Sequence, residues 1–172
     1  VVAGFLNSFI RHADVVKIAN IAQIVNIIAP LQTRGDDLLV QTIFYPFEMY
    51  ACRREGTSLR VVNNGPDYFA PSYGTTRVID SSAILNGDKL HVFVTNRSLT
   101  ETAPLEVHLA DGELTALESG EMLTGPAVDS ANTFEQPHLI APQPVSAIQI
   151  LNGAAAFELP PLSVAALTFL RK

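Results

Sequence analysis

Cysteine is nearly absent from this 172-residue chain, and because Cys52 is its one thiol no disulfide can form within it. No CxxC or HExxH motif occurs, and the four histidines are scattered along the sequence. These absences argue against a zinc site and against a cysteine–histidine nucleophile, so we expect neither a metal nor another cofactor. A lone thiol fits a reducing compartment and favours a cytoplasmic location.

Basic residues are missing from a long stretch of the chain. Between Arg97 and Arg171 there is no Lys or Arg but there are nine carboxylates, and the formal net charge is −6. A nucleic-acid partner is not expected, because binding to a phosphate backbone relies on clustered positive charge. We interpret the acidic stretch as a solvated surface. A calcium site is the alternative, although no DxDxDG-like loop supports it.

No apolar run is long and continuous enough to span a membrane, and the first residues lack the basic region of a signal peptide. Hydrophobic residues nevertheless make up 48% of the chain, which is enough for a sizeable core and excludes general disorder. The chain begins at Val1, in the middle of a helical pattern. We therefore expect it to be the C-terminal piece of a longer protein.

Residues 1–55 have a helical pattern at each end. Over residues 1–12, apolar side chains recur at the spacing of one helix face. A second helix is predicted over 45–55, where Pro46 suits the first turn and Gly56 is placed to end it. The "TRGDD" stretch at 33–37 predicts a turn between two apolar runs.

Residues 56–172 have a different pattern, made of short β-branched or alternating segments. These segments are "SLRVV", "TTRVIDSSAIL", "KLHVFVTNR", "LEVHL", "ELTALES", "VSAIQIL" and "SVAALTFL". Turn pairs separate them, at Asn86-Gly87, Asp111-Gly112, Gly125-Pro126 and Asn152-Gly153. This spacing predicts an all-β antiparallel sandwich or jelly roll.

The segment "IANIAQIVNIIAP" at 18–30 is apolar but carries three amides, Asn20, Gln23 and Asn26. Its β-branched residues favour a strand buried on both faces, while the three-residue spacing of the amides also suits one helix face. Burying an amide without a partner costs about 1–3 kcal/mol. The amides therefore either satisfy buried backbone groups or line a cavity that binds something polar.

Three stretches resemble the C-terminal part of the bacterial α-L-arabinofuranosidases of glycoside hydrolase family 51. They are "RHADVVKIANIAQIVNIIAP", "TIFYPFEMYACRREG" and "SANTFEQPHLIAP", and their order and spacing also agree with that family. The resemblance implies the C-terminal remnant of a (β/α)₈ barrel over 1–55, followed by the sandwich over 56–172. On this view residues 1–12 are the seventh barrel helix, the run from Val15 is the eighth strand, and 45–55 is the closing helix.

The resemblance also implies a role for Gln23. In that family a glutamine in an Ala-Gln-x-Val-Asn run hydrogen-bonds the bound arabinofuranose, and a barrel site lies at the C-terminal ends of the strands. A neutral amide suits a sugar because it offers a hydroxyl both a donor and an acceptor. Gln23 is thus the expected substrate-binding residue, and Asn20 and Asn26 are expected to be structural.

No catalytic residue is expected within the chain. The family is retaining, and its acid/base and nucleophile glutamates belong to earlier barrel strands. Glu48 and Glu55 fall in or at the end of the outer helix, and no motif places a second carboxylate opposite either one. We expect Asp36 and Asp37, in the predicted turn, to face solvent.

The sequence thus predicts the C-terminal segment of an exo-acting α-L-arabinofuranosidase, inactive alone, that acts when whole on arabinofuranosyl oligosaccharides of arabinoxylan or arabinan. The resemblance implies two partners: the remaining N-terminal barrel portion and, in a homo-oligomer, further copies. A non-catalytic carbohydrate-binding or assembly module is the alternative, with Tyr68, Phe69 and Tyr73 as its only plausible platform. A related glucanase or xylosidase with the same plan also stays open.

Overall fold

In the computed structural model residues 1–145 and 147–172 are described, and they form two helices and thirteen strands. The first third of the chain holds α1 (Val2–Arg11), β1 (Leu31–Arg34), β2 (Asp37–Val40) and α2 (Phe44–Ala51). The next strands are β3 (Thr57–Leu59), β4 (Asp67–Ala70), β5 (Gly74–Arg77), β6 (Ile79–Asn86), β7 (Lys89–Asn96) and β8 (Ala103–Val107). The last are β9 (Leu114–Leu123), β10 (Gln143–Pro144), β11 (Gln149–Leu151), β12 (Ala154–Leu159) and β13 (Ser163–Arg171).

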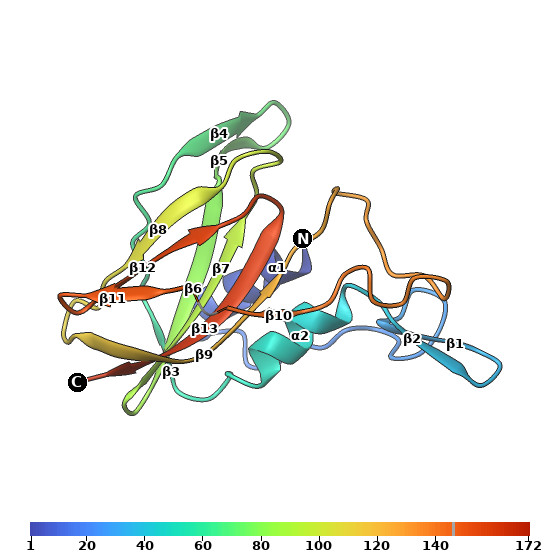
Figure 1. Ribbon diagram of the computed structural model, residues 1–172, viewed down its shortest axis with the longest axis horizontal. Helices are drawn as coiled ribbons and strands as arrows, with labels where there is room; N and C mark the ends of the chain where they lie inside the picture. The colour runs from blue at the N-terminus through green and yellow to red at the C-terminus, as the bar shows by residue number, and fades with distance from the viewer. Residues whose placement is uncertain (146) are drawn as a thin grey trace.

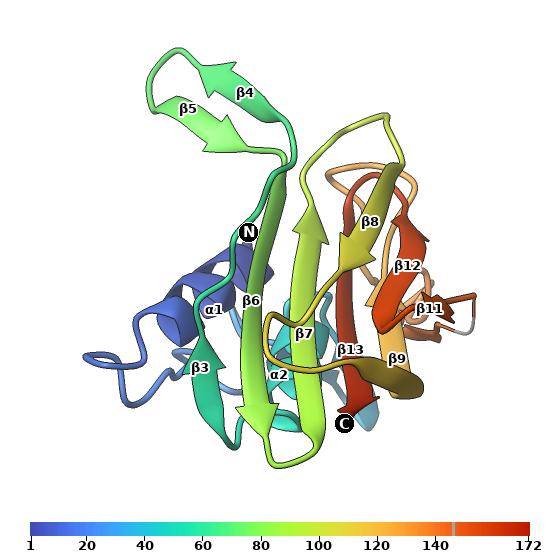
Figure 2. The same cartoon turned by 90° about the vertical axis from the view of Figure 1, so that its left-hand side faces the viewer.

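The strands form two principal antiparallel sheets and two hairpins. The larger sheet has the order β10-β9-β13-β7-β6-β3, and the smaller has the order β11-β12-β8. The hairpins β1-β2 and β4-β5 stand apart from both sheets (Figure 1). In Figure 2 the smaller sheet lies in front of the larger one, and the two helices lie behind it. The predicted antiparallel sandwich is therefore present, and helices form a third layer on its outer face.

The two central strands of the larger sheet are buried on both faces. In β13, Ala165, Leu167 and Phe169 face the smaller sheet, where they join a core with Phe157 and Leu159 of β12. The intervening residue Ala166 belongs instead to the core beneath the helices. A strand alternates its side chains, so one apolar segment can supply two cores when a layer covers each face.

The helices cover the larger sheet because each has an apolar face. Ala3 and Leu6 of α1 and Met49 of α2 are buried in the same core as Phe93 of β7. The ring of Tyr50 stacks on that of Phe93, with centroids 4.2 Å apart. No helix among the described residues has the length and apolar character needed to cross a bilayer.

Several predicted turns and helices are confirmed. Asn86-Gly87 joins β6 to β7, whose register pairs Asn86 with Lys89. Asn152-Gly153 joins β11 to β12, and the "TRGDD" turn joins β1 to β2. Both predicted helices are present, although α2 ends at Ala51, earlier than expected.

Gly56 does not end α2, so that prediction is wrong. It lies five residues beyond the last residue of the helix, at the entry to β3, with φ +124°. A Cβ added at this position would lie 2.3 Å from the backbone oxygen of Leu85. Glycine is needed here because β3 passes so close to the end of β6.

The strand expected from Val15 is wrong as well. Residues 16–24 are irregular, and the only pairing in this region is an isolated bridge between Val25 and Leu31. The apolar side chains of the segment are largely exposed, with 77% of Ile18 and 82% of Ile27 accessible. A barrel strand needs a neighbour on each edge, and none of the described residues supplies these neighbours. No barrel remnant is evident in the fold.

A groove of about 1510 Å³ lies on the side of the larger sheet that faces the smaller one. The smaller sheet does not extend over β6 and β3, so the apolar side chains of Leu59, Val61, Ile79 and Leu85 line this groove. The sandwich is therefore closed around β12 and β13 and open toward β3.

Candidate functional site

Gln23 lies in an irregular, exposed turn that precedes β1. Its backbone has φ +35°, and two further non-glycine residues of the same turn, Asn26 and Ile27, have φ +64° and +59°. Only two other non-glycine residues described, Asn152 and Leu162, have positive φ. Gln23 is exposed and makes no side-chain hydrogen bond within the part of the chain that the structure describes.

Asn26 holds this turn against the hairpin. Its Oδ1 accepts a hydrogen bond from the backbone N–H of Thr33 at 2.7 Å, and its Nδ2 lies 3.1 Å from Thr33 Oγ1. Its own backbone N–H donates to the carbonyl of Leu31 at 2.7 Å. Asn26 therefore has the structural role expected for it, and it explains one of the three amides in the apolar segment. Asn20 is exposed.

A long loop of the sandwich, residues 124–142, fastens the same hairpin from the other side. The amide of Asn132, 2% exposed, donates to the carbonyls of Val40 and Ile140 at 3.0 and 2.9 Å, and its Oδ1 accepts from the N–H of Ile140. At the hairpin tip, Arg34 pairs with Glu135 at 2.9 Å and lies over the ring of Phe134. Residues 23–41 are thus tied to the sandwich by side chains of one loop.

The carboxylates near this turn form no catalytic pair. Asp36 and Asp37 are exposed in the β1-β2 hairpin, as expected, and Glu48 and Glu55 are exposed in and after α2. No group of three or more His, Cys, Asp or Glu residues able to hold a metal ion occurs in the described ranges. Among the described residues, the turn that carries Gln23 therefore has no paired carboxylates that could act as acid, base or nucleophile.

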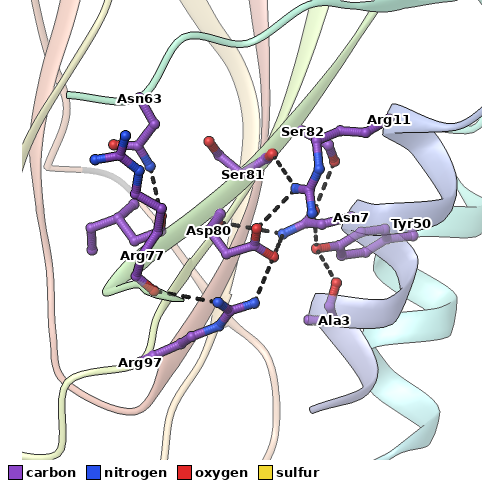
Figure 3. Close-up of polar contacts among 11 residues, drawn as sticks. Ala3, Asn7, Arg11, Tyr50, Asn63, Arg77, Asp80, Ser81, Ser82 and Arg97 are labelled. Atoms are coloured by element: carbon purple, nitrogen blue, oxygen red, sulfur yellow. Dashed lines mark hydrogen bonds and ion pairs between the residues drawn. The ribbon is translucent and has the colours of Figure 1, made fainter. Parts of the chain in front are cut away.

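A second polar cluster joins α1 to β6, and its centre is the carboxylate of Asp80 (Figure 3). Arg11 pairs with Asp80 Oδ1 at 2.9 Å, Arg97 pairs with Oδ2 at 3.2 Å, and Asn7 Nδ2 donates to Oδ2 at 3.1 Å. Asn7 is fully buried, and its Oδ1 accepts from the hydroxyls of Tyr50 at 2.8 Å and Ser82 at 2.7 Å.

This cluster is a joint between helix and sheet rather than a site for a ligand. Each polar atom that Asn7 and Asp80 bury has a partner within the chain, so none is left for a bound molecule. Burial raises the pKa of Tyr50, and the nearby charge of Asp80 adds to this effect. The phenol therefore stays protonated and keeps donating to Asn7.

A third polar group fastens the C-terminal end of α2 to the sheet. Arg53, 7% exposed, donates to Thr168 Oγ1 and to the Met49 carbonyl, and it pairs with Glu121 at 3.3 Å. His91 Nδ1 lies 3.0 Å from the same Thr168 hydroxyl. Burial lowers the pKa of His91, and the positive charges of Arg53 and Lys89 lower it further, against a smaller opposing effect of Glu118.

The aromatic residues of the alternative function lie on the β4-β5 hairpin, which projects from the sandwich (Figure 2). Tyr68, Phe69 and Tyr73 are 44%, 70% and 89% exposed. Asp67 and Arg77 close the open end of the hairpin with an ion pair at 3.2 Å.

Sequence reasoning missed the residues that hold the Gln23 turn in place. Asn132 falls within the "SANTFEQPHLIAP" stretch that contributed to the family resemblance, but its contact with β2 joins residues 92 positions apart. The sequence shows only an Asn in a loop-like stretch, and its burial is a property of the folded chain. The partner of that amide is not visible in any local pattern.

Comparison with known families gives a consistent result. Residues 1–163 match the model of the alpha-L-arabinofuranosidase C-terminal domain. An intracellular exo-α-(1→5)-L-arabinofuranosidase of Streptomyces lividans is 34% identical over 165 residues, which are 95% of this chain and 25% of that enzyme. An intracellular exo-α-L-arabinofuranosidase of Bacteroides ovatus is 27% identical over 94% of this chain and 32% of that enzyme.

Solved structures agree with these relatives. The family 51 α-L-arabinofuranosidase AbfB of Bifidobacterium longum superposes on 98% of this chain with a TM-score of 0.90 and 26% identity, and the match covers 34% of that enzyme. The chain spans about a quarter to a third of the length of the relatives named here. Since the family model matches nearly the whole chain, the chain belongs to the alpha-L-arabinofuranosidase C-terminal domain family, as its resemblance to glycoside hydrolase family 51 predicted.

Proposed function

We propose that this chain is the C-terminal segment of an exo-acting, retaining α-L-arabinofuranosidase that releases terminal arabinofuranosyl groups from arabinoxylan or arabinan oligosaccharides. In this proposal residues 1–55 complete the catalytic barrel, and residues 56–172 are the sandwich that braces it. Gln23 contributes to the pocket for the sugar. The acid/base and nucleophile glutamates lie outside the chain.

One observation carries the proposal. The chain superposes on AbfB over 98% of its length, so the match extends into the irregular, exposed part of the chain as well as the sandwich. The names of the Streptomyces and Bacteroides relatives support an exo mode of action on arabinofuranosides. The word intracellular in both names supports a cytoplasmic location for this protein.

The geometry around Gln23 suits a sugar ligand. The amide is exposed and carries no charge, so it can donate to one hydroxyl and accept from another without a large desolvation cost. In a retaining enzyme two carboxyl groups about 5–5.5 Å apart perform the chemistry, while neutral donors and acceptors orient the sugar. Gln23 has the second of these roles in our proposal.

The exposed apolar side chains of residues 15–28 support the partners that we propose. Ile18, Ile24, Ile27 and Ile28 are each at least 69% exposed, and large exposed apolar side chains that gather in one segment favour association in water. We infer that the remaining N-terminal barrel portion covers them in the whole enzyme. Copies of the whole enzyme then assemble as a homo-oligomer.

The experiment compares the full-length enzyme with the 172-residue chain on 4-nitrophenyl α-L-arabinofuranoside. Full-length protein is expected to hydrolyse it and to release arabinose one unit at a time from arabino-oligosaccharides. Its first product, followed by NMR, is expected to retain the anomeric configuration. The isolated chain is expected to show no turnover, and clear turnover by that chain contradicts the proposal.

The role of Gln23 is tested in the same enzyme. Gln23→Ala removes both hydrogen-bonding groups and is expected to lower kcat/KM about 10- to 100-fold, the effect of losing one or two good hydrogen bonds. Asn20→Ala is the matched control, because Asn20 is an exposed amide of the same segment. Equal kcat/KM values for the Gln23 variant and the wild type would remove Gln23 from the site.

The exposed aromatics of the β4-β5 hairpin favour the second candidate function, a non-catalytic carbohydrate-binding module. Calorimetric titration of the chain with arabinoxylan tests it, with a variant in which Phe69 and Tyr73 are replaced by alanine as the control. Binding that disappears in this variant supports the alternative. Absence of binding to the wild-type chain removes it.

A further inference from the structure

The backbone of residues 23–27 holds more residues in an unfavourable conformation than any other described segment. Of the five non-glycine residues described with positive φ, three fall within residues 23–27. One of them, Ile27, is β-branched, and its φ of +59° is a conformation that such residues rarely adopt. Strain of this kind persists only where the surrounding structure enforces it, and it is concentrated at ligand-binding sites.

The enforcing contacts come from the hairpin. Three hydrogen bonds fix the backbone around Asn26. The N–H of Asn26 donates to the Leu31 carbonyl at 2.7 Å, and the Asn26 carbonyl accepts from the N–H of Ala29 at 3.1 Å. The Asn26 side chain accepts from the N–H of Thr33 at 2.7 Å. Asn26 is also one of the few residue types that tolerate positive φ. This residue therefore supplies both the backbone conformation and the side-chain anchor of the turn.

The hairpin is anchored in turn by the sandwich. Gln41 donates from its backbone to the Pro30 carbonyl at 2.8 Å, and Asn132 holds the carbonyl of Val40 at 3.0 Å. The anchor is rigid because Asn132 is buried and all its amide atoms are bonded. A continuous set of hydrogen bonds thus runs from the loop 124–142, through β2 and β1, to the turn that carries Gln23.

We propose that Asn26 is a positioning residue for Gln23, and that Asn132 fixes the same turn to the sandwich, so that the sandwich sets the geometry of the sugar pocket. The proposal rests on the proposed role of Gln23 in binding the arabinofuranosyl group. It gives the non-catalytic domain a function in catalysis beyond bracing. A displacement of about 1 Å in a substrate-contacting group can cost about 100-fold in rate, so the anchor matters even though it does not touch substrate.

The test is a double-mutant cycle in the full-length enzyme, with 4-nitrophenyl α-L-arabinofuranoside as substrate. Asn26→Gly keeps the positive φ accessible but removes the side-chain anchor, and it is expected to lower kcat/KM about tenfold. Asn26→Asp keeps the Oδ1 acceptor for the Thr33 N–H and is expected to stay within about threefold of wild type. Asn132→Ala is expected to act in the same direction as Asn26→Gly.

The cycle separates positioning from general stability. In a Gln23→Ala background, Asn26→Gly is expected to lower kcat/KM by less than about twofold, because the group it positions is already gone. A tenfold loss in both backgrounds overturns the proposal, as does a wild-type kcat/KM for the single Asn26→Gly variant. If Gln23→Ala itself has wild-type kcat/KM, the role of Gln23 fails. If Gln23→Ala is impaired while Asn26→Gly is not, only the positioning role fails.

Thermal unfolding of each variant provides a second readout. Asn26→Gly and Asn26→Asp are expected to melt within a few degrees of each other, because the turn is exposed, while their kcat/KM values differ. Identical kcat/KM values for the two variants overturn the claim that the side-chain anchor positions Gln23.

Discussion

Two segments of this molecule are both mainly apolar, but only one of them is buried. Strand β13, Ser163–Arg171, lies between β7 and β9, and its residues Leu167 and Phe169 are 0% exposed. Residues 15–28 are richer in the strand-forming residues Ile and Val, but Ile18 and Ile27 are 77% and 82% exposed and no strand forms. The difference teaches that an apolar run becomes a buried strand only where other segments cover its edges and faces.

The largest expected effect is a loss of stability when a buried side chain of β13 is truncated. Phe169→Ala removes a fully buried ring and is expected to destabilise the chain by about 3–5 kcal/mol. Ile24→Ala, at a side chain 69% exposed, is expected to change the free energy of unfolding by less than about 0.5 kcal/mol. Urea denaturation followed by circular dichroism measures both. Similar changes in the free energy of unfolding for the two variants would contradict the difference in burial between the two segments.

The next effect concerns the joint that holds α1 on the sheet. Asn7→Leu keeps the volume of the side chain but removes its amide. The hydroxyls of Tyr50 and Ser82 and the carboxylate of Asp80 then each lose one hydrogen bond. Losing such a buried polar partner is expected to cost about 2–4 kcal/mol. Asn20→Leu, at an exposed amide, is the control. Urea unfolding is the measurement, and a neutral Asn7→Leu change contradicts the structural role of the cluster.

Residues 15–28, exposed in the isolated chain, are expected to be buried in the whole enzyme. Ile28→Ser is expected to cost the isolated chain less than about 0.5 kcal/mol, since the side chain is 70% exposed. In the full-length protein, where we propose that the barrel covers it, the same change is expected to cost about 2 kcal/mol. Thermal unfolding of both proteins tests this. Equal costs contradict the proposed covering.

The smallest effect is a dependence of stability on pH at the end of α2. The pKa of His91 is lowered in the folded protein by burial and by Arg53, so the unfolded chain binds the proton more readily. The neutral histidine therefore supports stability above about pH 6.5, the pKa of an ordinary histidine in the unfolded chain. That contribution is lost as the pH falls from there through the lower pKa of the folded protein.

The variant His91→Gln removes this titration while keeping a polar side chain at the position. Wild type is expected to lose more stability than His91→Gln between pH 7.5 and 5.5, as measured by urea unfolding at each pH. Parallel pH profiles for the two proteins are the contrary result. Glu118 and Glu121 are present in both proteins, so their contributions cancel in the comparison.

Much of the fold could be predicted from local patterns. The Asn86-Gly87 turn, the helix over residues 2–11 and the alternation in β13 each depend on neighbours in sequence, and each is confirmed. The strand from Val15 could not be judged in this way, because its apolar pattern is the same whether or not other strands flank it. Gly56 was misjudged for a similar reason, since its constraint comes from Leu85.

In the candidate site, too, local sequence predicted some features and contacts between distant residues decided others. Gln23 was found from a short run of residues and its resemblance to a family, and its role in binding stays a proposal. The contacts that fix its turn, from Asn26 to Thr33 and from Asn132 to Val40, join residues 7 and 92 positions apart. Periodicity and turn propensity carry no information about the second of these pairs.

The sequence by itself determined the positions of the turns, the apolar faces of the helices, the strands of the sandwich and the family to which the chain belongs. These depend on backbone preferences and side-chain spacing that act over a few residues. Only the tertiary structure decided which apolar run is buried, which polar groups meet around Asp80, and how the sandwich holds the turn of Gln23. Burial and hydrogen-bond satisfaction are properties of surroundings, and the surroundings of a residue come from distant parts of the chain.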